Sequence, residues 1–291
     1  MTLAREDWLA REALHRQRAD DLTAEHRDRA ARGEKHPVWD FLFTYYAYKP
    51  AQLRRWHPGA GVELADASER LSWRWYSPGS IDGAVVPDAV AFAREKTELA
   101  GLIERMLRRT ASRPGQFGCF GLHEWAMVYR ADEHRHPVPL RLGQAGTDAV
   151  VEGHDLRCTH FDAFRFFTPD AVPRNRTPLS REEQPLFEQP GCLHAGMDLY
   201  KWAMKLGPLV PGELLLDAFE LARDIRLLDM QAAPYDLSAW GVVPVPIETA
   251  DGKAEYVRRQ RGFAERGAAL RSALLDAWLG ENTAEVPARI A

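Results

Sequence analysis

An apolar stretch at residues 192–206, CLHAGMDLYKWAMKL, contains one histidine, one aspartate and two lysines. Steps of four, three and four residues place these polar side chains on one face of an α-helix. They are His194, Asp198, Lys201 and Lys205. Exposed ion pairs along such a face contribute less than about 1 kcal/mol each. A histidine and a carboxylate among apolar neighbours must instead be paired, hydrogen-bonded or metal-bound, which would give them a chemical role.

A second amphipathic segment, at residues 213–230, carries an acidic stripe beside an apolar one. The prolines and glycines of GPLVPG end one helix and start the next, so we expect an antiparallel helix pair. The acids would then face His194 and the lysines. The acidic stripe consists of Glu213, Asp217, Glu220 and Asp224.

Two further segments combine histidine with carboxylates. GCFGLHEWAMVYR places His123 and Glu124 after two glycines, a pattern typical of backbone that closely approaches a ligand or a neighbouring element. CTHFDAFRFF contains His160 and Asp162, whose side chains would point the same way on a β-strand. Such a pair suits a histidine oriented by a carboxylate, or two ligands of one metal, and is also common on protein surfaces.

Histidine and carboxylate ligands on helices can bind iron, manganese or zinc and activate water or oxygen. The chain has no HExxH sequence. Its cysteines, Cys119, Cys158 and Cys192, form no CxxC pair, so we interpret them as buried free thiols and not as a disulfide framework or zinc site. The candidate metal ligands are His123, Glu124, His160, Asp162, His194, Asp198, Glu220 and Asp224.

A carboxylate with a histidine or glutamate partner in an aromatic-lined pocket can also cleave an N-glycosidic bond. The carboxylate would stabilise the oxocarbenium-like sugar and activate water, while aromatic faces hold the base. We predict Asp198 or Asp224 as the catalytic carboxylate. The other candidate catalytic residues are His194, His123, Glu124 and Glu220. The candidate substrate-binding residues are Trp125, Tyr129, Trp202, Arg165, Lys201 and Arg223.

Long helical segments dominate the rest of the chain, which predicts a mainly α (α+β) fold, a single helical domain with one or two small antiparallel β-sheets. Further helices are expected at residues 4–34, 88–112 and 252–279. Alternation in RLSWRWYS predicts a hairpin over residues 71–87, and short strand-like runs predict a sheet over 138–162. The predicted organisation is an N-terminal charged helix (1–34), a catalytic domain (35–280) and a C-terminal tail (281–291).

Composition narrows the range of partners. The formal net charge of −4 argues against a broadly basic nucleic-acid-binding surface and favours a small substrate. Apolar runs such as LLLDAFELA are far shorter than the roughly 20 residues of a membrane helix, so no membrane partner is expected. The segment MTLAREDWLAREALHRQRADDL lacks the apolar centre of a secretory signal, which predicts a cytoplasmic protein.

Six stretches within residues 35–265 are distinctive: HPVWDFLFTYY, LRRWHPG, FGCFGLHEWAMVYR, HFDAFRFFTP, EQPGCLHAGMDLYKWA and ELARDIRLLDMQAAPYDL. Together they resemble a bacterial family, mainly actinobacterial, labelled 3-methyladenine DNA glycosylase. The resemblance implies excision of a base from DNA or a nucleotide. Better-known enzymes of that name use a helix-hairpin-helix or a zinc-binding fold, and this chain has neither sequence pattern. The site residues are therefore assigned from the physical pattern alone.

Three functions remain open at this point. The first is an N-glycosidase that releases a damaged or modified base from DNA or a nucleotide. The second is a helical metal-dependent hydrolase or oxygenase that uses the ligands above, and the third is a non-enzymatic interaction protein. If the substrate is DNA, the expected phosphate contacts are Arg54, Arg55, Arg258, Arg259 and Arg261.

Overall fold

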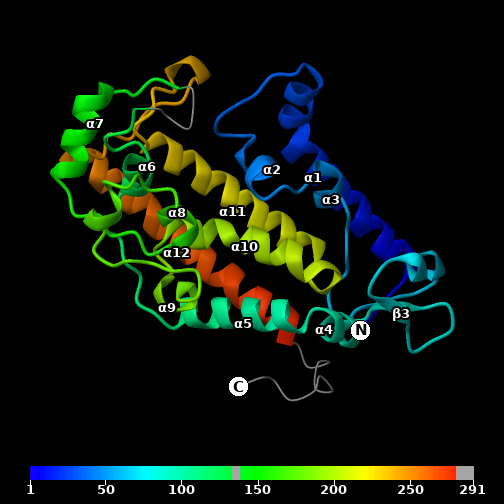
Figure 1. Cartoon of the computed structure of the whole chain (residues 1–291). Coiled ribbons are helices and arrows are strands. Elements are labelled where there is room, and N and C mark those ends of the chain that lie inside the picture. The colour runs from blue at the N-terminus through cyan, green and yellow to red at the C-terminus, as the bar shows by residue number, and fades with distance from the viewer. Residues whose placement is uncertain (133–137, 280–291) are drawn as a thin grey trace. The chain divides into compact units, whose positions relative to one another are not determined.

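The structure is a computed structural model that describes residues 1–132 and 138–279 (Figure 1). These residues form twelve α-helices, four 3-10 helices and four short strands. The predicted mainly α fold with a small sheet is therefore confirmed. The predicted tail, 281–291, lies outside the described residues. Among the described helices, none combines the length and the apolar character that crossing a membrane requires.

The chain divides into two compact units whose boundaries fall inside helices. Four long helices therefore contribute residues to both units: α5 (Thr97–Ala111), α10 (Leu193–Leu206), α11 (Gly212–Gln231) and α12 (Ala250–Leu279). Unit 1 consists of Met1–Arg108, Asp198–Ala222 and Ala269–Ala291. Unit 2 consists of Arg109–Met197 and Arg223–Ala268.

Unit 1 begins with strand β1 (Thr2–Leu3) and the long helix α1 (Arg5–Ala31), which confirms the predicted N-terminal helix. Opposite charges along α1 support it, as between Glu12 and Arg16, 2.8 Å apart. One side of α1 is buried, because Trp8 packs into an apolar core. The shorter helices of unit 1 are α2 (Phe41–Tyr45), α3 (Pro50–Leu53) and α4 (Ala89–Glu95), and it contains the 3-10 helices Ser68–Ser72 and Gly207–Leu209.

A four-stranded sheet covers the start of α1, in the order β1-β2-β4-β3. Strand β1 pairs in parallel with β2 (Glu63–Leu64), and β2 pairs antiparallel with β4 (Val85–Pro87). Strand β3 (Tyr76–Pro78) pairs antiparallel with β4, so the predicted hairpin over residues 71–87 is confirmed.

Unit 2 contains short helices in the region where a second sheet was expected. The sheet prediction for residues 138–162 is wrong, because helix α7 (Gly143–Glu152) occupies the middle of that segment. Its buried side chains, Thr147 and Val151, are four residues apart, which is the period of a helix and not of a strand. Asp162 likewise lies on a helix, α8 (Phe161–Phe164), so His160 and Asp162 are not strand neighbours. The short helices of unit 2 are α6 (Leu122–Ala126), α7, α8 (Phe161–Phe164) and α9 (Gln184–Phe187), with 3-10 helices at Val172–Arg174 and Ser238–Trp240.

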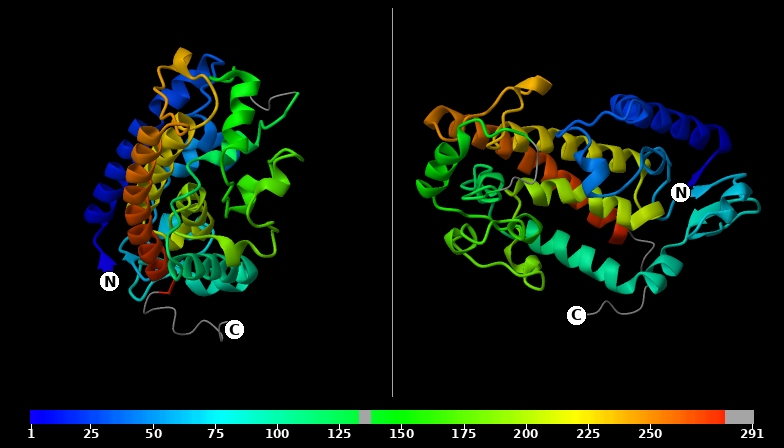
Figure 2. Two further views of the ribbon diagram at one scale, coloured as in Figure 1. Left: turned by 90° about the vertical axis from the view of Figure 1, so that its left-hand side faces the viewer. Right: turned by 45° about the horizontal axis from the view of Figure 1, so that its top comes forward.

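Helices α10 and α11 form the predicted antiparallel pair, and both views in Figure 2 show them side by side. In unit 1 the rings of Tyr200 and Phe219 are 5.2 Å apart. In unit 2 a Cβ at Gly196 would lie only 2.7 Å from Cδ1 of Ile225, so glycine permits this close approach. The predicted C-terminal helix is also present as α12.

Candidate functional site

A pocket that is open to solvent lies entirely within unit 2. Its volume is about 700 Å³ when the space open to solvent is included. A small cavity continues inward and shares Cys119, Arg157, Cys158, Thr159 and Gln189 with it. The outer pocket is further lined by Gln116, Phe117, Gly118, Arg176 and Thr177. The inner cavity is further lined by His123, Cys192, Leu193, His194, Tyr256 and Gln260.

All three cysteines line the inner cavity, although they are far apart in the sequence. Each is a free thiol, as predicted, but the expectation that all three are buried holds fully only for Cys158. Burial raises the pKa of the Cys158 and Cys192 thiols, which keeps both protonated at neutral pH. Cys119 differs from them because it is partly exposed and lines the outer pocket as well.

Cys119 is the first member of a chain of three side chains. Its Sγ lies 3.6 Å from Nδ1 of His123, within the range of a sulfur hydrogen bond. The other ring nitrogen of His123, Nε2, lies 2.8 Å from Oδ1 of Asp229. A thiol, an imidazole and a carboxylate in this order have the arrangement of a nucleophile, its base and the group that orients the base.

A tight turn places the thiol beside the imidazole. Phe120 and Gly121 both have positive φ, 51° and 74°, so the chain reverses directly after Cys119 and helix α6 begins at Leu122. The positive φ favours glycine at 121, and a Cβ there would also crowd Cβ of Ala232 at 3.2 Å. A positive φ at a non-glycine residue such as Phe120 is strained, and such strain clusters at functional sites.

Two buried ion pairs hold Asp229 in place. Nη1 of Arg226 donates to Oδ2 of Asp229 at 2.7 Å and to Oε1 of Glu124 at 3.1 Å. Both oxygens of Asp229 are thus used, one by His123 and one by Arg226. Helix α11 supplies Arg226 and Asp229, and α6 supplies His123 and Glu124, so packing of the two helices builds the network.

This network makes His123 an imidazolium. Burial alone would lower the pKa of His123, but the charge of Asp229 and the hydrogen bond to it raise that pKa well above its ordinary value. Burial would raise the pKa of Asp229, yet His123 and Arg226 keep the carboxylate ionised by holding that pKa low. The cluster then contains two positive groups, His123 and Arg226, and two negative groups, Asp229 and Glu124. Because these charges balance, the burial of the whole cluster is tolerable.

His194 lies beside this chain and remains neutral. Burial, followed by the positive charge of His123, lowers the pKa of His194 well below its ordinary value. Its ring meets the His123 ring edge-on at 4.5 Å and stacks on the His160 ring at 5.2 Å. In the part of the chain that the structure describes, His194 has no hydrogen-bond partner for its ring nitrogens, and it lines the inner cavity. The inner cavity encloses only about 10 Å³, so His194 is available to an atom or ion of about the size of one water molecule.

Of the eight predicted metal ligands, the structure brings two into one potential centre within unit 2. One ligand atom each from His123, His194 and Asp229 lie within 4.8 Å of one another. Other candidates of unit 2 have protein partners: Glu124 pairs with Arg226, and Nδ1 of His160 lies 2.9 Å from Oε1 of Glu188. Asp229, outside the predicted set, supplies the third donor.

The remaining predicted carboxylates form ion pairs elsewhere. In unit 1, Asp198 accepts from the Tyr46 hydroxyl at 2.9 Å and pairs with Lys201, and Glu220 lies 2.9 Å from Arg18. In unit 2, Asp224 lies 2.8 Å from Arg266 and 3.9 Å from Arg223. Asp162 lies 2.6 Å from Arg181 and 3.4 Å from Arg165. Within each unit, the ion pairs described above join the acidic stripe of α11 to arginines and not to His194.

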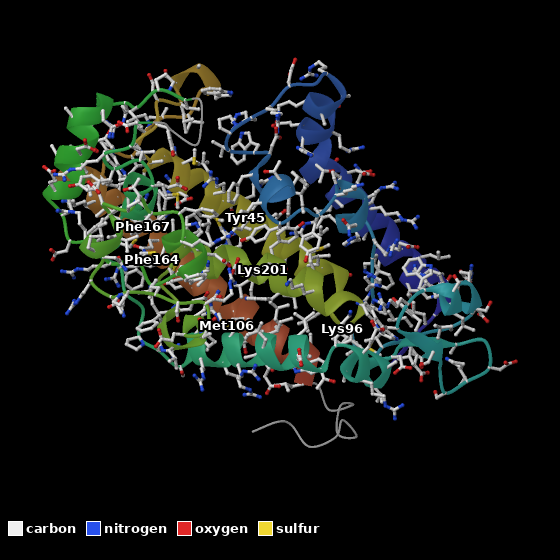
Figure 3. The ribbon with its side chains drawn as sticks, in the orientation of Figure 1. Tyr45, Lys96, Met106, Phe164, Phe167 and Lys201 are labelled. Atoms are coloured by element: carbon white, nitrogen blue, oxygen red, sulfur yellow. The ribbon has the colours of Figure 1, made fainter. Side chains whose placement is uncertain are left out.

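The predicted aromatic walls are mostly core. Trp125 and Tyr129 are buried, with Trp125 donating to the carbonyl of Ala232 at 2.8 Å, and neither lines the pocket. In unit 1, Trp202 is buried beneath the amine of Lys201, 4.1 Å from its ring centre. Figure 3 shows Phe164 and Phe167 side by side, and their rings are 5.1 Å apart. The aromatic ring that does line the pocket mouth is Phe117.

The sequence interpretation missed Cys119 and gave Asp229 no role. The sequence GCFGLH contained the signal for this site: the cysteine precedes the histidine by four residues, and a glycine stands on each side of Cys-Phe. It marks a turn that can expose a thiol beside an imidazole. Comparisons of the chain with models of protein families, with characterised proteins and with solved structures give no match. The function is therefore inferred from the geometry of the site.

Proposed function

We propose that the protein is a thiol-dependent enzyme that transfers or hydrolyses an acyl group, with Cys119 as its nucleophile. The observation that carries the proposal is the Cys119–His123–Asp229 chain, which ends on a pocket open to solvent. Thiols act as nucleophiles in their ionised form, and an adjacent imidazolium favours that form. The two other cysteines are less suitable because burial raises the pKa of each.

The reaction proceeds by addition and elimination. The sulfur of Cys119 attacks the carbonyl carbon, an S–C bond forms, and the carbonyl π electrons move onto oxygen. Collapse of this adduct breaks the bond to the leaving group, which takes the proton from His123. A water molecule, or another acceptor, then attacks the thioester carbonyl while His123 accepts its proton and Asp229 holds the ring in place. The S–C bond breaks, the acyl product leaves, and the Cys119 thiolate and the His123 imidazolium are restored.

Release of a base from DNA or a nucleotide, which the resemblance implies, remains a prediction. That chemistry needs a carboxylate next to the sugar. The described residues that line the pocket and its inner cavity include no aspartate or glutamate. Asp229, the nearest carboxylate in the network, lies behind His123 with both oxygens bonded.

An activated ester tests the proposal without knowledge of the natural substrate. p-Nitrophenyl acetate should give a burst of p-nitrophenol and an acetyl group on the peptide that contains Cys119, detected by mass spectrometry. Cys119→Ala should abolish both, whereas Cys158→Ala and Cys192→Ala should retain both. Acetylation of another residue, or no acetylation with a folded protein, would overturn the proposal.

A metal-dependent enzyme is a second candidate, because His123, His194 and Asp229 form a potential two-histidine, one-carboxylate centre. This donor set suits iron(II) with open positions for oxygen or substrate. Elemental analysis of the wild type and of His194→Ala distinguishes the two functions. Stoichiometric metal that the variant loses would favour the metalloenzyme. A metal-free protein whose His194→Ala variant still acetylates Cys119 would favour the thiol enzyme.

A further inference from the structure

The pocket mouth is positively charged. Arg157 and Arg176 both line it and both are exposed, and the described lining contains no carboxylate. The hydroxyls of Thr159 and Thr177 and the amides of Gln116 and Gln189 also line the mouth, and all of them are neutral. A concave surface with two guanidinium groups and hydroxyl donors is suited to binding an anion.

The guanidinium groups are available for a ligand. Arg157 pairs with Asp155 at 3.2 Å, but the Asp155 side chain is 80% exposed, and such surface pairs are weak. Arg176 has no side-chain partner within the described residues, and its backbone N–H donates to the carbonyl of Leu156 at 2.8 Å. An incoming anion therefore displaces little.

The two arginines are carried by segments that are fixed to each other. Asn175, which is buried, accepts from the Cys158 N–H at 2.8 Å and donates to the Cys158 carbonyl at 3.1 Å. This double hydrogen bond joins the residue before Arg176 to the residue after Arg157. The mouth is thus preorganised and does not depend on a loose loop.

Arg157 also lies next to the nucleophile. A Cβ at Gly118 would be 3.7 Å from both Cδ and Nη1 of Arg157, so this side chain runs along the residue that precedes Cys119. An anion held by Arg157 would therefore reach the thiol with a short connecting chain. Without the space that opens to solvent the pocket encloses about 260 Å³, near the lower end of the range for small-molecule sites, so it suits a compact ligand.

We infer that the acyl substrate is a small molecule with an anionic group, a carboxylate or a phosphate, that binds Arg157 and Arg176 while its carbonyl reaches Cys119. The inference rests on the proposed function for the role of Cys119, but the anion site itself does not. The two can therefore be tested separately.

Alkylation of the full-length protein measures both charge selection and thiol reactivity. Iodoacetate and iodoacetamide react alike, since the thiolate forms an S–C bond and iodide leaves, but only iodoacetate is anionic. We expect the ratio of iodoacetate to iodoacetamide rates at Cys119 to exceed that of free glutathione by about threefold to tenfold. Arg157→Gln and Arg176→Gln should each reduce the ratio, and Arg258→Gln, a matched exposed arginine of unit 2 outside the pocket, should not.

Inorganic phosphate serves as a probe that does not depend on thiol chemistry. Phosphate should slow the alkylation of Cys119, and calorimetric titration should show a Kd that rises at least about tenfold in the double variant Arg157→Gln, Arg176→Gln. Acetate in place of phosphate reports whether the site prefers a carboxylate. A short DNA duplex should protect no better than phosphate at equal phosphate concentration.

The outcomes separate the two ideas. Phosphate binding that the arginine variants weaken, with an unreactive Cys119, would support the anion site and count against the thiol enzyme. An unaltered alkylation ratio together with absent phosphate binding would overturn the anion site even if Cys119 is acetylated. Much stronger protection by the duplex would overturn the small-molecule substrate.

Discussion

At the scale of single residues, the site depends on how Asp229 is compensated. A fully buried carboxylate is costly unless its charge and both oxygens have partners, and here His123 and Arg226 provide them. The same contacts fix the His123 ring and keep it protonated. The same contacts therefore position His123 and make the burial of Asp229 possible.

Asp229→Asn tests this positioning role. The amide removes the charge that raises the His123 pKa, so we expect Cys119 acetylation at pH 7 to slow by roughly a hundredfold or more. The acetylation rate should decline at high pH, where His123 loses its proton. In Asp229→Asn this decline should occur at lower pH than in the wild type. The measurement is the pH profile of acetylation by p-nitrophenyl acetate.

Asp224→Asn is the matched control, because Asp224 lies on the same helix in an exposed pair with Arg266. It should leave the rate and its pH profile unchanged. A large effect of Asp224→Asn with none of Asp229→Asn would instead return the catalytic role to the residue that the sequence pattern favoured. An Asp229→Asn profile with the wild-type shape would show that Asp229 is only structural.

At the scale of elements, helix α12 shows that glycines in one helix have different roles. A Cβ added at Gly252 would clash with the carbonyl oxygen of Pro246, a backbone atom that cannot move aside easily. A Cβ added at Gly262 would have no neighbouring atom within 4 Å, and this residue is exposed. Close approach of the 246 segment, and not helix propensity, therefore requires glycine at 252.

Gly252→Ala and Gly262→Ala should change stability in opposite directions. Gly262→Ala should stabilise the protein by roughly 0.5–1 kcal/mol, because alanine is the better helix former. Gly252→Ala should destabilise it by about 2 kcal/mol or more, because backbone must shift. Urea denaturation of both variants measures the difference, and equal shifts would contradict the close contact.

At the scale of the whole molecule, each unit contains a histidine whose pKa is strongly lowered. In unit 1, burial, together with the charges of Arg70 and Arg55, lowers the pKa of His57 to about 3. Nδ1 of His57 lies 2.8 Å from the Tyr76 hydroxyl. In unit 2, His194 also has a strongly lowered pKa. The unfolded chain binds protons at these positions below about pH 6.5, and the folded chain does not.

Stability should therefore fall on acidification from pH 7 to 5, by about 2 kcal/mol for each of the two histidines. His123 does not add to this fall, because a raised pKa gives stability that is complete below about pH 6.5 and is lost only as pH rises. Urea denaturation at both pH values measures the change. His57→Gln should reduce the pH dependence by about 2 kcal/mol, and an undiminished dependence would contradict the assignment.

The sequence by itself determined the elements that depend on local pattern. The long helices α1, α10, α11 and α12 and the hairpin of β3 and β4 follow from amphipathic period, charge pairs and turn residues. Local pattern failed at residues 138–162, where short apolar runs fit a strand and a helix equally well, and packing of Val151 decided for a helix.

Only the tertiary structure decided which polar residues meet. The pattern identified His123 and His194 as candidates, and both line the inner cavity. It could not identify the partner of His123, because Asp229 is 106 residues away along the chain. Nor could it bring Cys119, Cys158 and Cys192 to one cavity, since their spacing carries no motif. Helical period fixes the face on which a side chain lies, but the packing of distant helices fixes what that face contacts.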